Sequence, residues 1–186
     1  NQIKWYIQMD ILGPFYLENS VQKNYFISCE DDCARKTSSD WYYRKRSVVD
    51  VLVDVLENYI VENGKPLKIL HDIGKQFTSK IFRHFLEKNR IKDKPIPKDY
   101  PQLQGKIEAF NKIVKNEFLA VENISNRKEG KKMYSMFVKA YNEEIEHHGG
   151  INGHTPSEMF LMKGRLNSCN NNKTVKQIKS VTHVGK

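Results

Sequence analysis

The chain has 186 residues, of which 39% are apolar and 11% aromatic, so it can bury one good core but is too short for two full-sized domains. Lysine and arginine outnumber the acids 31 to 22, and the formal charge of +9 favours a polyanionic partner, nucleic acid first, over a neutral small molecule. On charge alone, a merely soluble basic surface stays open as the alternative.

Cysteine usage and hydropathy indicate a protein that works inside the cell. The cysteines are odd in number and lack zinc-finger spacing, which predicts reduced thiols: Cys29, Cys33 and Cys169. No apolar run approaches the ~18 residues of a membrane span, and no signal peptide is visible. We therefore expect no membrane association and a location in the cytoplasm, nucleoid or nucleus, depending on the host. The first residue is not methionine, so we also expect neighbouring domains.

The first predicted strand covers residues 3–11. Its side chains alternate between apolar and more polar, the period of a half-buried strand, with Trp5, Ile7, Met9 and Ile11 on the apolar side. Asp10 is then at the end of this strand, on its more polar face. Gly13-Pro14 predicts a turn directly after it.

A meander and a crossover follow. Residues 24–30 and 37–44 predict two short antiparallel strands, and a helix begins after Ser47, a good cap, and ends near Gly64. The run LKIL, residues 67–70, predicts a short buried strand that leads straight into Asp72. Because a helix joins this strand to the earlier ones, we expect a right-handed crossover and a parallel pairing.

The remaining elements are mostly helical. Helices are predicted at about residues 77–89, 105–119 and 129–147, with a possible edge strand from residue 91 that continues as a proline-punctuated loop. The last of these helices is expected to pack five residues inward: Met133, Met136, Phe137, Tyr141 and Ile145. From Gly164 the sequence has too few apolar residues to extend the core. We therefore predict one domain over residues 1–163 and a polar, basic tail or linker over residues 164–186.

Three acids are candidates for a shared site. On the predicted helix at 105–119, Glu108, Lys112 and Lys115 lie on one face, away from the apolar stripe. Alone, Glu108 and Lys112 would be an ordinary surface pair. Asp10 and Asp72, however, follow strands that are expected to be neighbours, and a helix across the sheet can bring Glu108 to them. Carboxylates so close repel one another unless cations neutralise them, and oxygen ligands of this kind select Mg²⁺ or Mn²⁺.

The motifs around these acids carry a family resemblance. The interval between Asp72 and Glu108 is 108 − 72 − 1 = 35 residues. Over about residues 3–162 the chain resembles the catalytic core of the retroviral-type integrase and transposase superfamily (D,D-35-E). The matching motifs occur in the family's order: W-x-x-x-x-D at Trp5 to Asp10, D-x-G-x-x-F at Asp72 to Phe77, P-Q-x-Q-G-x-x-E at Pro101 to Glu108, N-K-x-x-K at Asn111 to Lys115, Y-N at Tyr141-Asn142, and H-x-x-I-x-G-x-T-P-S-E-M at His148 to Met159.

The resemblance implies a fold and a reaction. The fold is α/β and ribonuclease H-like, a five-stranded mixed sheet with helices on both faces. The implied activity is that of a DNA-recombining phosphoryl transferase, which nicks mobile-element ends and joins their 3′-hydroxyls to target DNA with two Mg²⁺ or Mn²⁺ ions per site. Asp10 would bridge both ions, and Asp72 and Glu108 would each complete one site.

The resemblance also implies partners. Nucleic-acid-binding roles fall on Gln104, in a mobile loop, and on Asn111, Lys112 and Lys115. Joining two DNA ends requires at least two copies of the chain, so we expect a homo-oligomer, at least a dimer. The isolated core is expected to bind DNA weakly and with strong salt dependence.

Some residues depart from the family pattern or invite another reading. His71 and Ile73 flank Asp72 where small or polar residues are usual, and Lys75 is unexpectedly basic. Because of these departures, a second function remains an alternative: a domesticated integrase that has lost catalysis and acts as a DNA-binding or assembly module. A stand-alone nuclease of the same fold is a further alternative. Three histidines are interpreted as structural, not as zinc ligands: His147, His148 and His154. For Asp31-Asp32 a hydrogen-bonded turn is favoured over a metal site.

Overall fold

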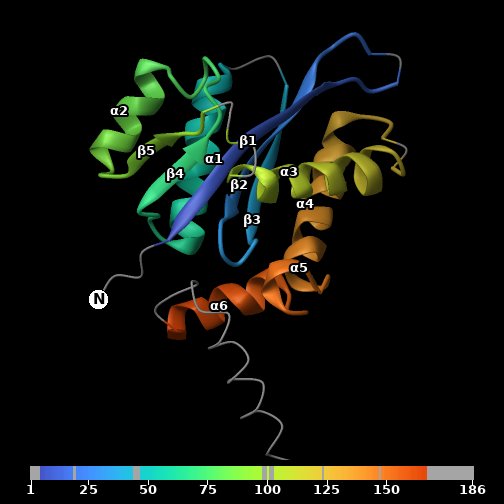
Figure 1. The fold of residues 1–186 in the computed structure, drawn as a ribbon. Helices are drawn as coiled ribbons and strands as arrows, with labels where there is room; N and C mark the ends of the chain where they lie inside the picture. Colours follow the sequence, from blue (N-terminus) through green and yellow to red (C-terminus); the bar gives the residue numbers. More distant parts are fainter. Residues whose placement is uncertain are drawn as a thin grey trace, which may run out of the picture.

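The computed structural model describes residues 5–18, 20–43, 47–97, 100, 103–122, 124–146 and 148–166. Within them, one mixed sheet has the strand order β3-β2-β1-β4-β5 (Figure 1). Its strands are β1 Tyr6–Phe15, β2 Asn24–Asp31, β3 Thr37–Tyr43, β4 Lys68–His71 and β5 Lys92–Pro95. Strands β1, β2 and β3 pair antiparallel, whereas β4 runs parallel to both β1 and β5. The predicted five-stranded mixed sheet and its parallel fourth strand are confirmed.

Helices cover both faces of this sheet, as predicted (Figure 1). One face carries α1 Val48–Asn63 and α2 Lys80–Lys88, and the other carries α3 Gly105–Ile113, its π-helical continuation η2 Val114–Leu119, and α4 Arg127–Glu143. Two short helices follow, α5 His148–Ile151 and α6 Pro156–Leu166. Ser47 caps α1 as expected, because its side chain accepts a hydrogen bond from the Val49 N–H at 3.2 Å.

The alternation along β1 divides the core into two layers. Ile7 and Met9, both fully buried, belong to the core under α1 and α2. Leu12 belongs to the second core, under α3, η2 and α4. Gln8 and Asp10 have the same parity as Leu12, so they lie on the α3 side of the sheet.

Strand β1 is longer than predicted. It runs through Gly13-Pro14 to Phe15, and a register shift between Leu12 and Phe15 lets its pairing with β2 continue past the proline. Asp10 therefore lies in the middle of β1, not at its end. The expectation of a turn after Asp10 was wrong because the partner strand β2 extends the pairing that the sequence signal would have ended.

Helix α4 turns inward most of the face that was predicted. Tyr141 is buried, and Met133 and Phe137 pack partly buried against the second core, as expected. Tyr134 and Val138 are buried beside them, whereas Met136 is 63% exposed and Ile145, past the end of the helix, is 38% exposed, so the prediction was wrong for those two.

Gly130 of α4 is also buried, and a Cβ there would clash with the Trp41 ring of β3. The backbone of α4 therefore approaches the sheet closely enough to need glycine at this position.

The C-terminal helix α6 was not predicted. Thr155 begins it with a capping box: the Glu158 N–H donates to the Thr155 hydroxyl at 3.2 Å, and the Thr155 N–H donates to the Glu158 carboxylate at 3.0 Å. The T-P-S-E motif thus has a structural role, as expected for the segment around His154. Helix α6 passes Gly164 and ends at Leu166, and the rest of the predicted tail lies outside the described residues, as does His147.

Two further expectations concern cysteines and membranes. Cys29 is a free, buried thiol, but Cys33 is in a disulfide, so the prediction of reduced thiols was wrong for Cys33. Among the described residues, no helix combines the length and apolar character that a membrane span requires.

Candidate active site

Asp10 is the innermost of the three predicted acids. It lies on β1 facing α3, half-buried between the sheet and that helix. The Asn111 side-chain amide of α3 donates a hydrogen bond to its Oδ2 at 2.7 Å. A charged acceptor makes this bond stronger than a neutral one, so α3 is tied directly to the carboxylate.

Asp72 directly follows β4, the parallel neighbour of β1. The parallel ladder between β1 and β4 ends with the pair Gln8 and Leu70. Two residues further along the chain lie Asp10, within β1, and Asp72, the first residue after β4. Because side chains alternate in phase on parallel strands, the two carboxylates are presented on the same face, the one that α3 crosses.

Glu108 reaches this face from α3. The helix buries Ile107, Phe110 and Asn111 against the sheet, and Glu108 is exposed beside them. Its position at the first turn also places a negative charge near the positive end of the helix dipole.

The other two acids act electrostatically on Asp10. Burial is the largest cause that raises the pKa of Asp10 above its usual value, and repulsion from the Asp72 and Glu108 carboxylates raises it further. Hydrogen bonds from the Ile11 backbone and from Asn111 act in the opposite direction. The structure therefore brings all three predicted acids into one electrostatic site.

Their donor chemistry fits a divalent cation. Carboxylate oxygens are the preferred ligands of Mg²⁺ and Mn²⁺, and a cation would relieve the cost that burial and repulsion impose on the charge of Asp10. Among the described residues, however, no three His, Cys, Asp or Glu side chains are gathered tightly enough to form a ready-made metal cluster. The site is an open arrangement around Asp10, in which the exposed Glu108 has the most room to move.

The loop after β4 explains the D-x-G-x-x-F motif. The Gly74 N–H donates to Asp72 Oδ1 at 3.0 Å, and a Cβ at Gly74 would lie 2.9 Å from the same oxygen. Glycine thus permits the close approach that orients the Asp72 carboxylate. At the end of the motif, the buried Phe77 ring stacks on His71 at 4.6 Å between centroids.

The unusual residues around Asp72 have separate explanations. His71 is 1% exposed and points to the opposite side of the sheet, where its Nε2 lies 2.6 Å from Asp93 Oδ1 of β5. It therefore ties β4 to β5 and leaves the acids unobstructed. Ile73 and Lys75 are exposed in the loop.

The predicted nucleic-acid contacts divide into two groups. Lys112 and Lys115 are exposed on the same helical segment as Glu108, and Gln104 is half-buried at the N-cap of α3. Asn111 is 7% exposed, and its amide donates to Asp10. In this structure it contacts a carboxylate of the site, and its contact with nucleic acid stays a prediction.

The Asp31-Asp32 turn is structural, as predicted. Asp31 Oδ1 accepts hydrogen bonds from the N–H groups of Cys33 at 3.0 Å and Ala34 at 2.7 Å. Asp32 next to it is paired with Lys106 of α3 at 2.9 Å. Sequence reasoning missed this pair, and it also missed Gln8, whose only signal was a polar residue two positions before Asp10 on the same strand face.

Comparison with known proteins begins with sequence. No protein-family model matches the chain. It is 26% identical, over 113 residues, to the retrovirus-related Pol polyprotein from transposon TNT 1-94 of Nicotiana tabacum. This match covers 58% of the chain but 8% of that polyprotein, so the chain corresponds to a small part of this relative.

Solved structures give a broader match. A chain of the simian T-cell lymphotropic virus intasome in complex with the PP2A regulatory subunit B56 gamma has a TM-score of 0.66 at 19% identity, over 83% of this chain and 53% of that one. The HTLV-2 integrase catalytic core domain in complex with magnesium has TM-scores of 0.64 in its trimeric form and 0.61 in its dimeric form, both at 19% identity. The alignments cover 83% of this chain and 95% and 94% of those chains. The chain therefore has the fold of these integrase catalytic cores, and the predicted ribonuclease H-like fold is confirmed.

Proposed function

We propose that this chain, which shares its fold with retroviral integrase catalytic cores, is the catalytic core of a DNA-recombining phosphoryl transferase. It would nick the ends of a mobile element and join the freed 3′-hydroxyls to target DNA. The observation that carries the proposal is the convergence of Asp10, Asp72 and Glu108 on one electrostatic site, from β1, the end of β4 and α3.

Both steps of the proposed reaction are in-line displacements at phosphorus. In nicking, water forms the new P–O bond and the 3′ oxygen of the broken strand leaves as a hydroxyl. In joining, that 3′-hydroxyl attacks a target phosphodiester, whose own 3′ oxygen leaves. A divalent cation, when bound, would polarise the phosphodiester and stabilise the leaving oxygen, and two ions would serve both sides of the displacement.

The residues have distinct proposed roles. Asp10, central among the acids, would contact both cations, and Asp72 and Glu108 would each complete one cation site. Asn111 would keep the Asp10 carboxylate charged and correctly turned, since its amide donates to Oδ2. The Gly74 N–H would do the same for Asp72. The HTLV-2 core, which has the same fold, was solved with magnesium.

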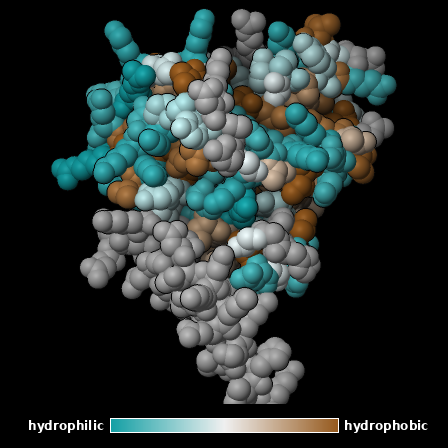
Figure 2. Space-filling model, in the orientation of Figure 1, coloured by the Kyte–Doolittle hydropathy of each residue, from teal (hydrophilic) through white to brown (hydrophobic). Residues whose placement is uncertain are grey.

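Charge supports DNA as the substrate. Lys112 and Lys115 are exposed on the segment that carries Glu108, where they would hold phosphates near the reacting bond, and Gln104 would make a further contact at the N-cap of α3. A second cationic surface lies on α2, β5 and the turn between them, where hydrophilic residues gather at the upper left of Figure 2. Its exposed cations are Lys80, Arg83, Lys88, Arg90, Lys92 and Lys94. Such surfaces bind the phosphate backbone without reading sequence.

The proposal extends to assembly and location. Two element ends must be joined in one event, so at least two copies of the chain would act together on DNA. Related folds occur in an intasome and in dimeric and trimeric forms of an integrase core. The substrate places the reaction wherever the host keeps its DNA, the nucleoid or nucleus, with the cytoplasm as the route to it.

A strand-transfer assay with Mg²⁺ or Mn²⁺ tests the proposal on oligonucleotides that carry the element's own end sequence. A branched oligonucleotide that imitates the joined product is assayed in parallel, because the reverse reaction needs no recognition of a free end. Glu108→Gln is compared with the matched control Glu117→Gln, an exposed acid on η2. We expect the first substitution to abolish product, by about 100-fold or more, and the second to leave it unchanged.

The other outcomes separate the alternatives. Equal product from Glu108→Gln and wild type contradicts the catalytic role of Glu108. If the wild-type chain nicks DNA but neither joins ends to target DNA nor reverses the joining on the branched oligonucleotide, the result supports a stand-alone nuclease. DNA binding with no phosphoryl transfer supports a silent binding or assembly module.

A further inference from the structure

Helix α3 begins without a cap of its own. Its N-cap residue is Gln104, whose side chain makes no capping hydrogen bond. The first residue of α3, Gly105, is not packed against a neighbour either, since a Cβ added there would meet no atom within 4 Å. The first N–H groups of any helix lack partners inside the helix and must be satisfied from elsewhere. The first turn of α3, which carries Glu108, therefore depends on groups outside the helix.

The sheet supplies the missing cap. The Ile107 N–H, at the third position of α3, donates to Gln8 Oε1 at 3.3 Å, and this is one of the positions that N-cap side chains normally serve. The Nε2 of the same Gln8 side chain donates to Asp32 Oδ1 at 2.7 Å. Gln8 is 1% exposed, so water cannot take the place of either partner.

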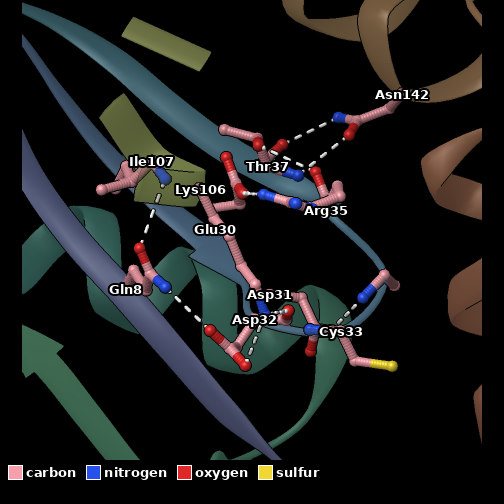
Figure 3. A network of polar contacts seen from close by, with 11 residues as sticks. Gln8, Glu30, Asp31, Asp32, Cys33, Arg35, Thr37, Lys106, Ile107 and Asn142 are labelled. Carbon is pink, nitrogen blue, oxygen red and sulfur yellow. Dashed lines mark hydrogen bonds and ion pairs between the residues drawn. The ribbon is translucent and has the colours of Figure 1, made fainter. Parts of the chain in front are cut away.

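Asp32 and Lys106 connect Gln8 back to the first turn of α3. The Asp32 N–H donates to the Tyr6 carbonyl of β1 at 2.9 Å, which fixes the turn after β2. The Lys106 ammonium lies 2.9 Å from Asp32 Oδ2 and also donates to the Asp32 carbonyl oxygen. Figure 3 shows Gln8 between Asp32 and Ile107, with one end of its amide turned to each. We call Gln8, Asp32, Lys106 and the Ile107 N–H the Gln8 clamp.

The clamp and the catalytic acids share their supports. Gln8 and Asp10 lie on one face of β1, two residues apart, and Glu108 directly follows Ile107 in α3. The clamp holds α3 before Glu108, and the bond from Asn111 to Asp10 holds it after Glu108. Because the Glu108 side chain is exposed, its placement has to come from the backbone that carries it.

We propose that Gln8 is a positioning residue for phosphoryl transfer: by capping α3 from the sheet, with the Asp32–Lys106 pair, it sets where Glu108 stands relative to Asp10 and Asp72. The inference rests on the proposed function of these acids as cation ligands. Gln8 does not itself contact the reacting groups, and it acts through Ile107 and the first turn of α3.

The test uses Gln8→Ala and the matched control Asn142→Ala. Asn142 is also a buried amide on this side of the sheet, and it bridges both backbone groups of Thr37 at 2.9 and 2.7 Å, but it joins α4 to β3. Both variants lose a bridging amide, so a purely structural effect should be alike in the two. Only Gln8→Ala should loosen the start of α3.

Two readouts are expected to move together in Gln8→Ala. Amide hydrogen exchange at Ile107 and Glu108, followed by NMR without cation, should speed up by about fivefold or more relative to the rest of the core, the size of a lost helix cap. The Mg²⁺ concentration for half-maximal strand transfer should rise by about tenfold, as when a supporting contact behind a metal ligand is removed. DNA affinity in EDTA should stay within about twofold of wild type, because the clamp faces no phosphate.

Exchanging the amide and the carboxylate between positions 8 and 32, called the charge swap, should restore the contact that Gln8→Glu alone breaks. Gln8→Glu keeps an acceptor for Ile107 but repels Asp32, so it should behave like Gln8→Ala. Adding Asp32→Asn restores a donor–acceptor pair, and both readouts should return toward wild type. If Gln8→Ala does not fold, Lys106→Gln tests the same clamp at a side chain that is 36% exposed, with a smaller shift in the same direction.

The result that overturns the positioning role is unchanged exchange at Ile107 in Gln8→Ala, an equal rise in Mg²⁺ requirement in Asn142→Ala, or no recovery in the charge swap. Wild-type protein that lacks strand transfer counts against the proposed function, and not against the docking of α3. Even without strand transfer, amide exchange at Ile107 and Glu108 can be measured in Gln8→Ala and in the double variant Gln8→Glu with Asp32→Asn. These exchange rates decide whether Gln8 holds the start of α3.

Discussion

Glu30 is a buried acid beside the clamp whose charge the fold disfavours. It lies on β2, fully buried, 3.4 Å from the Arg35 guanidinium. Burial raises the pKa of Glu30 to about 8, and the attraction of Arg35 and Lys106 offsets only part of that rise. Desolvation is therefore stronger than ion pairing at this site, as is common for buried carboxylates.

This raised pKa predicts how stability depends on pH. Between pH 4.5, the ordinary pKa, and about 8, the folded chain keeps a proton on Glu30 that the unfolded chain has released. The free energy of unfolding should therefore fall as pH rises through this window, by about 1 kcal/mol per pH unit, and level off above it. Glu30→Gln should remove this slope and be more stable than wild type at pH 8.

Urea unfolding at several pH values between 5 and 9 measures the effect. Glu57→Gln, an exposed acid on α1, serves as the control and should keep the wild-type slope. A slope in Glu30→Gln equal to that of wild type would show that Glu30 titrates normally in the folded chain.

Asn111 makes a second prediction at the residue scale. Asn111→Leu keeps the volume but removes the donor to Asp10 Oδ2, so the pKa of Asp10 should rise further and its charged form should be less available. We expect Mg²⁺ to bind about 10-fold more weakly, as measured by calorimetry. Asn63→Leu, which removes a buried amide from α1 on the opposite face, should lose stability but keep its Mg²⁺ affinity. Equal affinities in the two variants would contradict the role assigned to Asn111.

At the scale of elements, two glycines should respond oppositely to alanine. Gly130 lets α4 approach β3, and a Cβ there would lie 2.6 Å from Ile124 and clash with Trp41. Gly130→Ala should destabilise the fold by about 1–3 kcal/mol despite its better helix propensity. Gly105 has open space around it, so Gly105→Ala should stabilise by about 0.5–1 kcal/mol. Chemical denaturation of both variants checks the pair, and a stable Gly130→Ala would show that α4 can shift away from the sheet.

The elements also show what sequence could and could not predict. Periodicity and apolar runs located β1 to β4, because these strands bury at least one face. β5 is exposed at all four of its residues, so it was predicted only as a possible edge strand. Periodicity missed α6, whose start is signalled by a capping box and not by a long apolar stripe. On α4 it missed the buried Tyr134 and Val138 and wrongly turned Met136 inward. The close contact of Gly130 with β3 is tertiary and leaves no periodic signal.

The candidate site also has parts that the sequence predicts and parts that it does not. The interval between Asp72 and Glu108 and the surrounding motifs are enough to single out the three candidate acids from the sequence alone. The Gln8 clamp could not be found this way, because a cap supplied by another strand leaves no pattern in the local sequence. The hydrogen bond of Asn111 to Asp10 could not be found this way either, since its neighbours in sequence are exposed lysines while its own side chain is buried.

For the whole molecule, charge predicts how DNA binding depends on salt. Lys112→Gln and Lys115→Gln should each weaken binding about equally on any sequence and lower the slope of log affinity against log salt by about 1. Lys65→Gln is the control, because Lys65 precedes β4 and so lies at the opposite end of that strand from Asp72. Fluorescence anisotropy from low to moderate salt measures all three. Unchanged slopes in the first two variants would move the DNA contact away from the Glu108 segment.

The parallel pairing of β1 with β4 has a consequence for how such chains can change length during evolution. The paired residues differ by a constant offset, 68 − 6 = 70 − 8 = 62, and the same offset joins Asp10 to Asp72. Insertions or deletions in the connections between these strands change the offset but leave the two carboxylates side by side. An insertion of a single residue inside β4 would instead turn Asp72 to the α2 side of the sheet. Lineages carrying this fold should therefore vary freely in the spacing between the two aspartates, while the few residues that lead from each strand into its aspartate keep a fixed length.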